Sequence, residues 1–338
     1  MFLGPENQRV EHQLLELKAE IERLQAVLRC MELSRSWRIT RPLRTFAATI
    51  RVRQLERWWR RLLRKKYLVE LSPIDFHAKL AIDTKHHVPK VCGIVHLFYT
   101  DLAVEIFDTL LKCDSLHSVL ITTPSVNDDA LKLGVERLKK SRPNLLVEIV
   151  WVENLGRDVL PFLQSADHPF IRECDVILKL HTKKSPHLST RQGAIWRQQL
   201  LRQLCPDRTI INYIVTSLAT SPDYLIACPA DFLAGRESWG ANRRRARQLL
   251  TNIGLPSRMP LIFPAGSMFW CRRELLEKAS PLANYFVSFP GDNFKFDGTD
   301  AHAVERLFGL VALAHNRKVW AYTLSEDAGH GNPPWAST

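Results

Sequence analysis

The spacing of apolar residues near the start of the chain predicts a helix that pairs with another helix. From Val10 to Met31, apolar residues recur at alternating gaps of four and three, and charged residues stand between them. This heptad pattern predicts a short coiled coil over residues 1–33. A single amphipathic helix that packs on its own protein is the alternative. With a coiled coil, we expect a homo- or hetero-oligomer.

Residues 34–72 have a different pattern, in which aromatic and aliphatic residues interleave with arginine and lysine. Residues 35–66 contain 12 Lys or Arg and one acidic residue, Glu56. A helix over about 46–69 with two adjacent tryptophans and a densely cationic face is typical of a helix lying on an anionic membrane surface. Two alternatives stay open: a nucleic-acid-binding patch, in which the rings stack on bases, and an ordinary solvated helix.

From residue 73 to 338, short apolar runs alternate with segments of helical periodicity. The expected strands cover 91–99, 117–124, 145–154 and 175–181, and the expected helices cover 102–113 and 128–140. Continuous apolar strands separated by helices predict an α/β domain with a mostly parallel, Rossmann-type sheet covered by helices on both faces. Ligands bind beyond the carboxyl ends of such strands, so a site is expected just after Tyr99, Thr123, Asn154 and Leu180.

Composition and charge narrow the class of protein. The chain has 338 residues, of which 46% are hydrophobic and 24% charged, and this excludes a wholly disordered chain or a small disulfide scaffold. Outside the basic segment, residues 67–338 carry 31 basic and 28 acidic side chains. This near-neutral balance weakens the nucleic-acid alternative, and we expect no nucleic-acid partner.

The cysteines and the hydropathy pattern bear on where the protein works. Seven scattered cysteines without metal-ligand spacing favour reduced, packed thiols in a cytosolic protein. No apolar run reaches 18 residues, and the first residues lack the pattern of a secretory signal. We therefore expect a cytoplasmic protein that is peripheral on the inner face of the cytoplasmic membrane.

The segment ENLGRDVLPF (153–162) follows the third expected strand and could bind a phosphate group. Asn154 and Gly156 favour a tight turn. Arg157 offers a planar fork for phosphate or carboxylate. Asp158 could hold a ribose hydroxyl or cap a helix. A plain strand–turn–helix junction is the alternative.

The segment LKLHTKKS (178–185) runs out of the fourth expected strand and is rich in basic side chains. His181, Lys183 and Lys184 are three potential cations at the carboxyl edge of a parallel sheet. Such a group would suit a diphosphate, whose charge must be neutralised when its bond to a sugar breaks. A solvated lysine loop is the alternative.

Two later segments contain further candidates. In FPAGSMFWCRREL (263–275), Gly266 and Ser267 separate a strand from an aromatic run, and Arg272 either points at a ligand or lies on a helix surface. The other segment, DGTDAHAVERL (297–307), is expected to open a helix.

In this helix, Thr299 is expected at the N-cap and Asp300 in the first turn. His302 and Glu305 stand three residues apart and share one face, so together they could perform general acid–base chemistry. Asp297 is a further candidate base. A capped helix with only intrahelical contacts is the alternative.

These four segments, in this order and spacing, resemble the rhamnan synthesis protein F family over about residues 90–325. The family is associated with bacterial cell-surface rhamnose polysaccharides and lipopolysaccharide O-antigens. The resemblance implies a glycosyltransferase that moves rhamnose or a related sugar from a nucleotide-diphosphate donor, such as dTDP-rhamnose or a GDP-sugar, to a lipid-linked glycan acceptor. A non-catalytic scaffold or glycan-binding subunit of a polysaccharide assembly complex is the alternative.

The order of the segments is also similar, more distantly, to that of glycosyltransferases with the GT-A fold. This likeness implies donor binding by Asn154, Gly156, Arg157, Asp158, His181, Lys183 and Lys184, acceptor binding by Gly266, Ser267 and Arg272, and a catalytic acid or base among Asp297, Asp300, His302 and Glu305. One departure matters, because His181-Thr182-Lys183 stands where those enzymes have a metal-binding Asp-x-Asp. We therefore expect no resident metal ion and no other cofactor.

Overall fold

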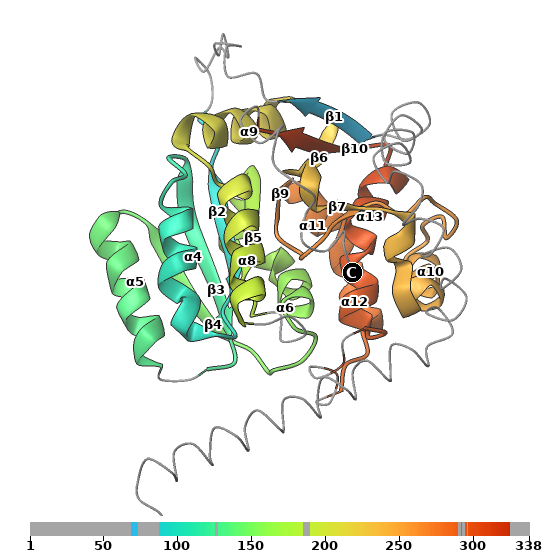
Figure 1. Ribbon diagram of the computed structural model, residues 1–338, viewed down its shortest axis with the longest axis horizontal. Helices are drawn as coiled ribbons and strands as arrows, with labels where there is room; N and C mark the ends of the chain where they lie inside the picture. The colour runs from blue at the N-terminus through green and yellow to red at the C-terminus, as the bar shows by residue number, and fades with distance from the viewer. Residues whose placement is uncertain are drawn as a thin grey trace, which may run out of the picture. The chain divides into compact units, whose positions relative to one another are not determined.

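An eight-stranded sheet forms the centre of the computed structural model (Figure 1). The structure describes residues 69–73, 88–125, 128–184, 190–289, 292, 295 and 297–324. The predicted coiled coil and nearly all of the predicted membrane-surface segment lie outside these residues.

The strands lie in the order β1-β10-β6-β9-β5-β2-β3-β4. Their bounds are β1 Val69–Pro73, β2 Val91–His96, β3 Leu116–Thr123, β4 Leu146–Trp151, β5 Val176–His181, β6 Tyr224–Pro229, β9 Phe269–Arg272 and β10 Lys318–Thr323. Two short strands, β7 Leu233–Ala234 and β8 Phe263–Pro264, form a separate antiparallel pair.

All neighbouring strands of the large sheet run parallel except β9, which is antiparallel to both β5 and β6. The parallel strands therefore end at one edge, where β2 ends at His96 and β5 at His181, and where β9 begins at Phe269. We refer to this edge as the carboxyl edge. The mostly parallel α/β sheet predicted from the sequence is confirmed, and β9 is its one antiparallel member among the described strands.

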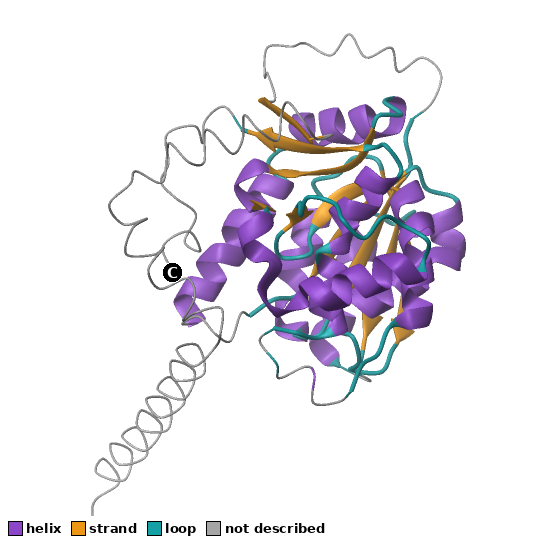
Figure 2. Ribbon diagram, turned by 90° about the vertical axis from the view of Figure 1, so that its right-hand side faces the viewer, coloured by secondary structure: helices purple, strands orange, loops and turns teal. Residues whose placement is uncertain are grey.

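Helices cover both faces of the sheet (Figure 2). One face carries α4 Ala103–Leu110, α5 Asp129–Ser141, α8 Thr190–Leu204 and α9 Arg208–Thr220. The other carries α6 Val159–Gln164, α7 Pro169–Arg172, α10 Arg243–Asn252, α11 Arg273–Ala279, α12 Asp300–Glu305 and α13 Leu307–Ala314. The connections include the 3₁₀ helices η1 Thr100–Leu102, η2 Ser165–Asp167, η3 Ala230–Phe232, η4 Arg236–Asn242 and η5 Ser280–Tyr285.

The helix boundaries follow from local capping. The Asp128 side chain accepts a hydrogen bond from the Leu131 amide at the start of α5, and Asp207 does the same for Ile210 at the start of α9. Strands β2 and β5 are buried on both faces over their whole length, which is why their sequences read as continuous apolar runs.

Strand β1 starts four residues before the boundary at residue 73 that the sequence suggested for the α/β domain, and it pairs with β10. Six of the seven cysteines lie in the described residues, and all six are buried free thiols, as expected. Among the described helices, none combines the length and apolar character needed to cross a bilayer.

Candidate functional site

The four segments singled out in the sequence come together at the carboxyl edge. Lys179, near the end of β5, donates to Asp158 just before α6 and also to Ser267 just before β9. The Gly266 amide in turn donates to Glu305 at the end of α12. Hydrogen bonds between residues 21, 88 and 39 positions apart thus link all four segments, and this edge is the candidate active site.

The turn before β9 has a strained backbone that neighbouring side chains hold. Gly266 has φ +87° and Ser267 has φ +58°, a region that costs a residue with a Cβ on the order of 1 kcal/mol. A Cβ on Gly266 would come within 2.3 Å of the Trp196 ring. His181 Nε2 donates to the Gly266 carbonyl at 2.8 Å, and the Gly266 amide donates to Glu305 Oε1 at 3.0 Å.

A buried ion pair lies beneath this turn. Lys179 is 1% exposed, and its Nζ donates to Asp158 Oδ2 at 2.5 Å, Ser267 O at 2.7 Å and Ser267 Oγ at 2.9 Å. Burial raises the pKa of Asp158, but the neighbouring His181 and Lys179 together outweigh burial and hold this pKa well below its usual range. Asp158 is therefore a carboxylate at neutral pH and serves as the counter-ion of Lys179.

His181 contributes to the same buried layer. Its Nε2 faces the Gly266 carbonyl, and its Nδ1 lies 3.3 Å from the Thr182 carbonyl and 3.9 Å from Asp158 Oδ1. Burial lowers the pKa of His181, and Asp158 only partly offsets this. The structure thus assigns this side chain to the support of the turn, rather than to a cation that faces a ligand.

The turn before α6 positions Arg157. Gly156 and Arg157 are consecutive left-handed residues, with φ +68° and +56°, and the Gly156 amide donates to Ser288 Oγ at 2.9 Å. The Arg157 guanidinium donates to the carbonyls of Asp292 and Lys295. Asn154 is exposed in the preceding loop.

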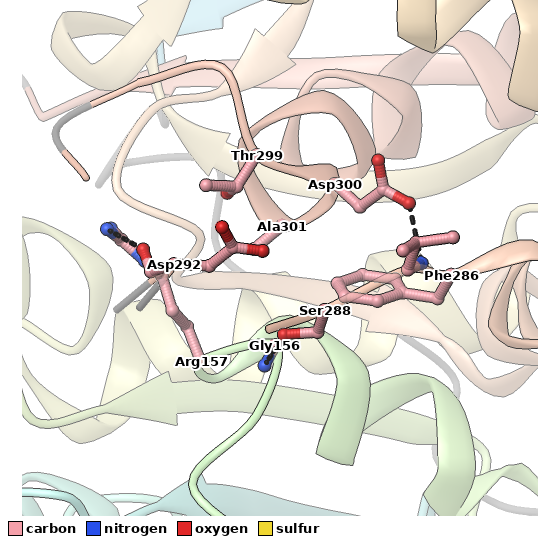
Figure 3. Close-up of a pocket in the computed structure, with 9 residues that line it drawn as sticks. Gly156, Arg157, Phe286, Ser288, Asp292, Thr299, Asp300 and Ala301 are labelled. Carbon is pink, nitrogen blue, oxygen red and sulfur yellow. Dashed lines mark hydrogen bonds between the residues drawn. The ribbon is translucent and has the colours of Figure 1, made fainter. Parts of the chain in front are cut away.

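A small hollow lies between this turn and the start of α12 (Figure 3). The free space in this hollow, together with the open solvent at its mouth, is about 160 Å³. Figure 3 shows the Arg157 guanidinium and the Asp300 carboxylate on opposite sides of it. The hollow is lined by Gly156, Arg157, Phe286, Val287, Ser288, Asp292, Thr299, Asp300 and Ala301.

Helix α12 begins with a capping box that fixes the tautomer of His302. Thr299 is the N-cap as predicted, and its amide and hydroxyl both lie within reach of His302 Nδ1, at 3.4 and 2.7 Å. Because the amide can only donate, Nδ1 must carry the lone pair, and the neutral ring has its proton on Nε2. Burial first, and then the charge of Arg157, lower the pKa of His302 to about 4. At neutral pH, His302 is therefore a hydrogen-bond donor through Nε2.

The three candidate carboxylates have different surroundings. Asp300 accepts two parallel hydrogen bonds from Arg245, both at 2.7 Å, and a third from the Val287 amide. Asp297 accepts from the Ala241 amide and from the Asn242 side chain.

Burial raises the pKa of Asp297, but the Asn242 hydrogen bond and further groups outweigh burial and lower this pKa overall. Both aspartates thus hold loops in place. Glu305 uses Oε1 for the Gly266 amide, while Oε2 lies 3.9 Å from Arg306 Nη1. The Glu305 side chain is 19% exposed and that of Asp297 36%.

The two lysines after β5 also differ from each other. Lys183 Nζ lies 4.4 Å from the centre of the Trp196 ring. Burial lowers the pKa of Lys183, and the negative charge of Glu305 opposes this. Lys184 is exposed and pairs with Asp101 at 2.7 Å. Lys183 instead lies over the Trp196 ring, which borders Gly266, the residue whose amide donates to Glu305.

Arg272 lies away from the other candidates. It is paired with Val176 at the start of β5, which places it at the opposite edge of the sheet. Its Nη1 donates to the carbonyls of Leu218, Ala219 and Ser221 at the end of α9. Because β9 runs antiparallel to β5, its last residue lies away from the other candidates, and the structure does not bring Arg272 together with them.

The residues at the end of β5 do not suit a divalent metal ion. His181 Nε2 is directed at the Gly266 carbonyl, and Thr182 Oγ1 accepts from the amides of Phe98 and Tyr99. Lys183 has no lone pair to offer while it is charged. Within the described ranges, no three His, Cys, Asp or Glu side chains are grouped as metal ligands.

Two side chains of the site were missed in the sequence. Lys179 stands inside the apolar run of β5, and a charge within a buried strand is itself a sign of a buried partner. Arg306 donates to the carbonyls of Ser238 and His302 and lies 3.5 Å from Asp297. No spacing rule in the sequence links Arg306 to Ser238, 68 residues away.

Comparison with known proteins identifies relatives of the chain. It is 34% identical over 235 residues to the uncharacterized protein WxcX of two strains of Xanthomonas campestris pv. campestris, B100 and ATCC 33913. The match covers 68% of this chain and 32% of WxcX, so the chain spans about a third of the length of these relatives.

Among solved structures, glucosyl-3-phosphoglycerate synthase from Mycobacterium tuberculosis, in complex with Mn²⁺, UDP and glucosyl-3-phosphoglycerate, aligns at 12% identity with a TM-score of 0.34. That alignment covers 74% of each chain. An active-site mutant of LgtC aligns at 11% identity and a TM-score of 0.34, over 68% of this chain and 72% of LgtC. Residues 1–349 of S. aureus TarS align at 14% identity with a TM-score of 0.33. That alignment covers 70% of this chain and 61% of the TarS chain.

The sequence model of one protein family covers most of the chain. This family is RgpF, rhamnan synthesis protein F, and the match extends over residues 54–317. It includes all four segments that meet at the carboxyl edge. The chain therefore belongs to the rhamnan synthesis protein F family.

Proposed function

We propose that the protein is a glycosyltransferase of bacterial cell-surface polysaccharide synthesis. The observation that carries this proposal is the grouping of Glu305 with two cationic side chains at the carboxyl edge. Lys183 Nζ lies 4.4 Å from the centre of the Trp196 ring, this ring borders Gly266, and the Gly266 amide donates to Glu305 Oε1. Arg157 lines the same hollow as Thr299, the N-cap of the helix that ends at Glu305. A base beside cations is what transfer of a sugar from a diphosphate requires.

In the proposed reaction, the acceptor hydroxyl oxygen forms a bond to the anomeric carbon of the donor sugar. The bond from that carbon to the diphosphate oxygen breaks, and the diphosphate leaves with the electron pair. Glu305 Oε2 takes the hydroxyl proton. Arg157 and Lys183 neutralise the departing diphosphate, and His302 donates from Nε2 to an oxygen of donor or acceptor.

The remaining candidates take supporting roles in this proposal. Asp158 and His181 hold the Gly266–Ser267 turn against which the acceptor would lie. Asp300 fixes the start of α12 through Arg245. Asn154 would contact the nucleoside, and Lys184, exposed beside Asp101, would meet the outer part of the donor.

We further propose a nucleotide-activated rhamnose, such as dTDP-rhamnose, as the donor and a lipid-linked glycan as the acceptor. The family name supports rhamnose, and the basic segment at 34–72 supports a cytoplasmic protein held at the inner face of the membrane. The heptad pattern at 1–33 supports oligomerisation. Because the end of β5 offers no suitable oxygen ligands, the proposal routes no step through a metal ion.

The test uses the full chain with dTDP-, GDP- and UDP-sugars and a lipid-linked glycan acceptor. We expect one donor to raise the melting temperature by mass action, and we expect release of the nucleoside diphosphate to persist in strong chelator. The Arg157→Met/Lys183→Met double variant should lose both effects. If none of the donors binds and none is consumed, the proposal fails. Stable glycan binding without donor binding would then favour a scaffold.

A further inference from the structure

Lys179 has an environment that its neighbours at the carboxyl edge do not share. Its side chain is 1% exposed on β5, and its three N–H donors match three acceptors: one oxygen of Asp158 and two of Ser267. The rings of Phe162 and Phe269 lie with their centres 5.2 and 5.9 Å from Nζ. A lysine with all its donors used inside the protein cannot bind a substrate.

The acceptors of Lys179 belong to the two sides of the proposed site. Asp158 directly follows Arg157, the proposed diphosphate ligand. Ser267 directly follows Gly266, whose amide holds Glu305 Oε1 at 3.0 Å. One ammonium group therefore ties the segment that carries Arg157 to the turn that orients Glu305.

Ser267 would not keep its conformation without such support. Its φ of +58° is unfavourable for a residue with a Cβ. Of the three contacts made by Lys179, two go to this residue, through its carbonyl and its hydroxyl. His181 holds only the preceding carbonyl, that of Gly266. The ammonium of Lys179 thus holds the carbonyl and the hydroxyl of Ser267, while the Ser267 amide donates to the Pro264 carbonyl.

We propose that Lys179 is a positioning residue, which sets the geometry between the cation Arg157 and the base Glu305 by holding Asp158 and Ser267 together. The effect of Lys179 on kcat that we expect rests on the proposed function. The effect on the Gly266–Ser267 turn does not depend on that function, because the turn should loosen whenever the Lys179 ammonium is removed. The two consequences can be measured separately.

The test variant is Lys179→Met combined with Asp158→Asn. Replacing the lysine alone would leave a buried carboxylate without a partner, whereas replacing both residues removes the pair without stranding a charge. Lys112→Met is the matched control, because the Lys112 ammonium also binds protein carbonyls, those of Cys205 and Pro206, but beyond the end of α4 at the opposite edge of the sheet. Ser267→Ala removes only the hydroxyl acceptor and keeps the ion pair.

The first measurement is amide hydrogen exchange, followed by mass spectrometry, in peptides spanning Ala265 to Met268. The amides of Ala265, Gly266 and Ser267 are bonded to Phe232, Glu305 and Pro264. We expect at least tenfold faster exchange in the double variant, about twofold in Ser267→Ala, and no change in Lys112→Met. Unchanged exchange in a folded double variant would overturn the inference.

The second measurement separates kcat from KM. A misplaced base slows the chemical step, so we expect kcat of the double variant to fall at least tenfold while KM for the donor stays within threefold. A fall within twofold, or a rise in KM alone, would overturn the inference. If the wild-type protein consumes no sugar nucleotide, the proposed function fails, while faster exchange in the double variant still supports the positioning role of Lys179.

Discussion

Lys179 and Lys183 stand four residues apart on one segment, yet they lie in opposite environments. Lys179 is enclosed and bonded to three oxygens of the protein, whereas Lys183 has its ammonium over the Trp196 ring and senses the charge of Glu305. The first charge is used to hold the fold at the site. In the proposed function, the second charge neutralises the diphosphate of the donor.

The carboxylates show the same division. Asp158 and Asp300 are each bonded to a basic side chain, Lys179 and Arg245, and each fixes a loop. Glu305 uses one oxygen for the Gly266 amide, and its other oxygen lies 3.9 Å from Arg306 Nη1. We propose that the charged residues of the carboxyl edge form two layers. The inner layer, which supports the fold, contains Lys179, Asp158, Arg245 and Asp300, and the outer layer, which takes part in the proposed reaction, contains Lys183 and Glu305. Mutations in the two layers should therefore separate stability from activity.

The largest effect on activity is expected from Glu305→Gln. The amide oxygen can still accept from the Gly266 amide, so the fold should lose less than about 1 kcal/mol. Without a base, however, transfer should slow by about 10²–10⁴-fold. Rate measurements at saturating donor test the expected loss of activity, and a melting curve tests the expected stability. A rate within a few-fold of wild type would remove Glu305 from the outer layer and leave Asp297 as the next candidate.

The largest effect on stability is expected from Asp158→Ala in the inner layer. This change leaves the Lys179 ammonium buried beside Ser267 without its counter-ion, which should cost about 3–5 kcal/mol. Urea unfolding at pH 7 measures the loss. Lys183→Met, measured in parallel, should change the free energy of unfolding by less than about 1 kcal/mol. Equal losses in the two variants would contradict the division into layers.

Acid should weaken the inner layer through His96, which lies at the end of β2 and whose Nδ1 is 3.0 Å from Thr122 Oγ1. Burial lowers the pKa of His96 from 6.5 to about 4. As pH falls, the unfolded chain takes up this proton near pH 6.5, but the folded protein takes it up only near pH 4. The stability contributed by the neutral ring is therefore complete above pH 6.5 and is lost as pH falls toward 4.

By pH 5 this loss should reach about 2 kcal/mol for His96. Urea unfolding at pH 7 and pH 5 measures it in the wild type and in His96→Gln, which cannot gain the proton. The difference between the two pH values should be smaller in the variant. The pKa of Asp158 lies below its usual range, so Asp158 contributes little to the change in stability between pH 7 and pH 5. An equal difference in both proteins would show that His96 is not the group responsible.

A smaller effect on activity is expected from Lys183→Met in the outer layer. The methionine keeps the stem that packs beside Trp196 and removes only the charge. We expect kcat/KM for the sugar nucleotide to fall about 10–100-fold, with the expressed protein as stable as wild type. Lys132→Met is the matched control, because the exposed Lys132 ammonium is likewise paired with an aspartate, Asp129, but lies on α5 and has no part in the proposed reaction. Its effect should stay within about threefold.

Local patterns predicted the first half of the α/β domain, from β2 to β5, whereas β6, β10 and the helices α8 to α10 were not predicted. The apolar runs at β2, β3, β4 and β5 and the periodicity of α4 and α5 gave elements within a few residues of the observed bounds. The Thr299 N-cap was also predicted, because capping depends on neighbours three residues apart. These features are local, so the sequence contains all the information they need.

The contacts of the charged residues come from residues far away in the chain. The sequence therefore could not predict which charged side chains are bonded to other parts of the protein. Asp300 looked like a base at a helix start, but Arg245, 55 residues earlier, occupies its carboxylate. His181 looked like a cation, but the Gly266 carbonyl, 85 residues later, takes its Nε2. The sequence also did not predict that β9 runs antiparallel to its neighbours. This direction determines which end of β9 lies at the carboxyl edge.

Arg272 offers the smallest effect on activity and the cleanest test of that direction. Because β9 runs antiparallel to β5, Arg272 lies beside Val176 at the edge opposite the site, bonded to three carbonyls at the end of α9. Arg272→Ala should lower the free energy of unfolding by about 1–2 kcal/mol and leave kcat and KM within twofold of wild type below the melting temperature. A selective rise in acceptor KM without loss of stability would place Arg272 at the acceptor after all, and would contradict the antiparallel register on which the two-layer comparison depends.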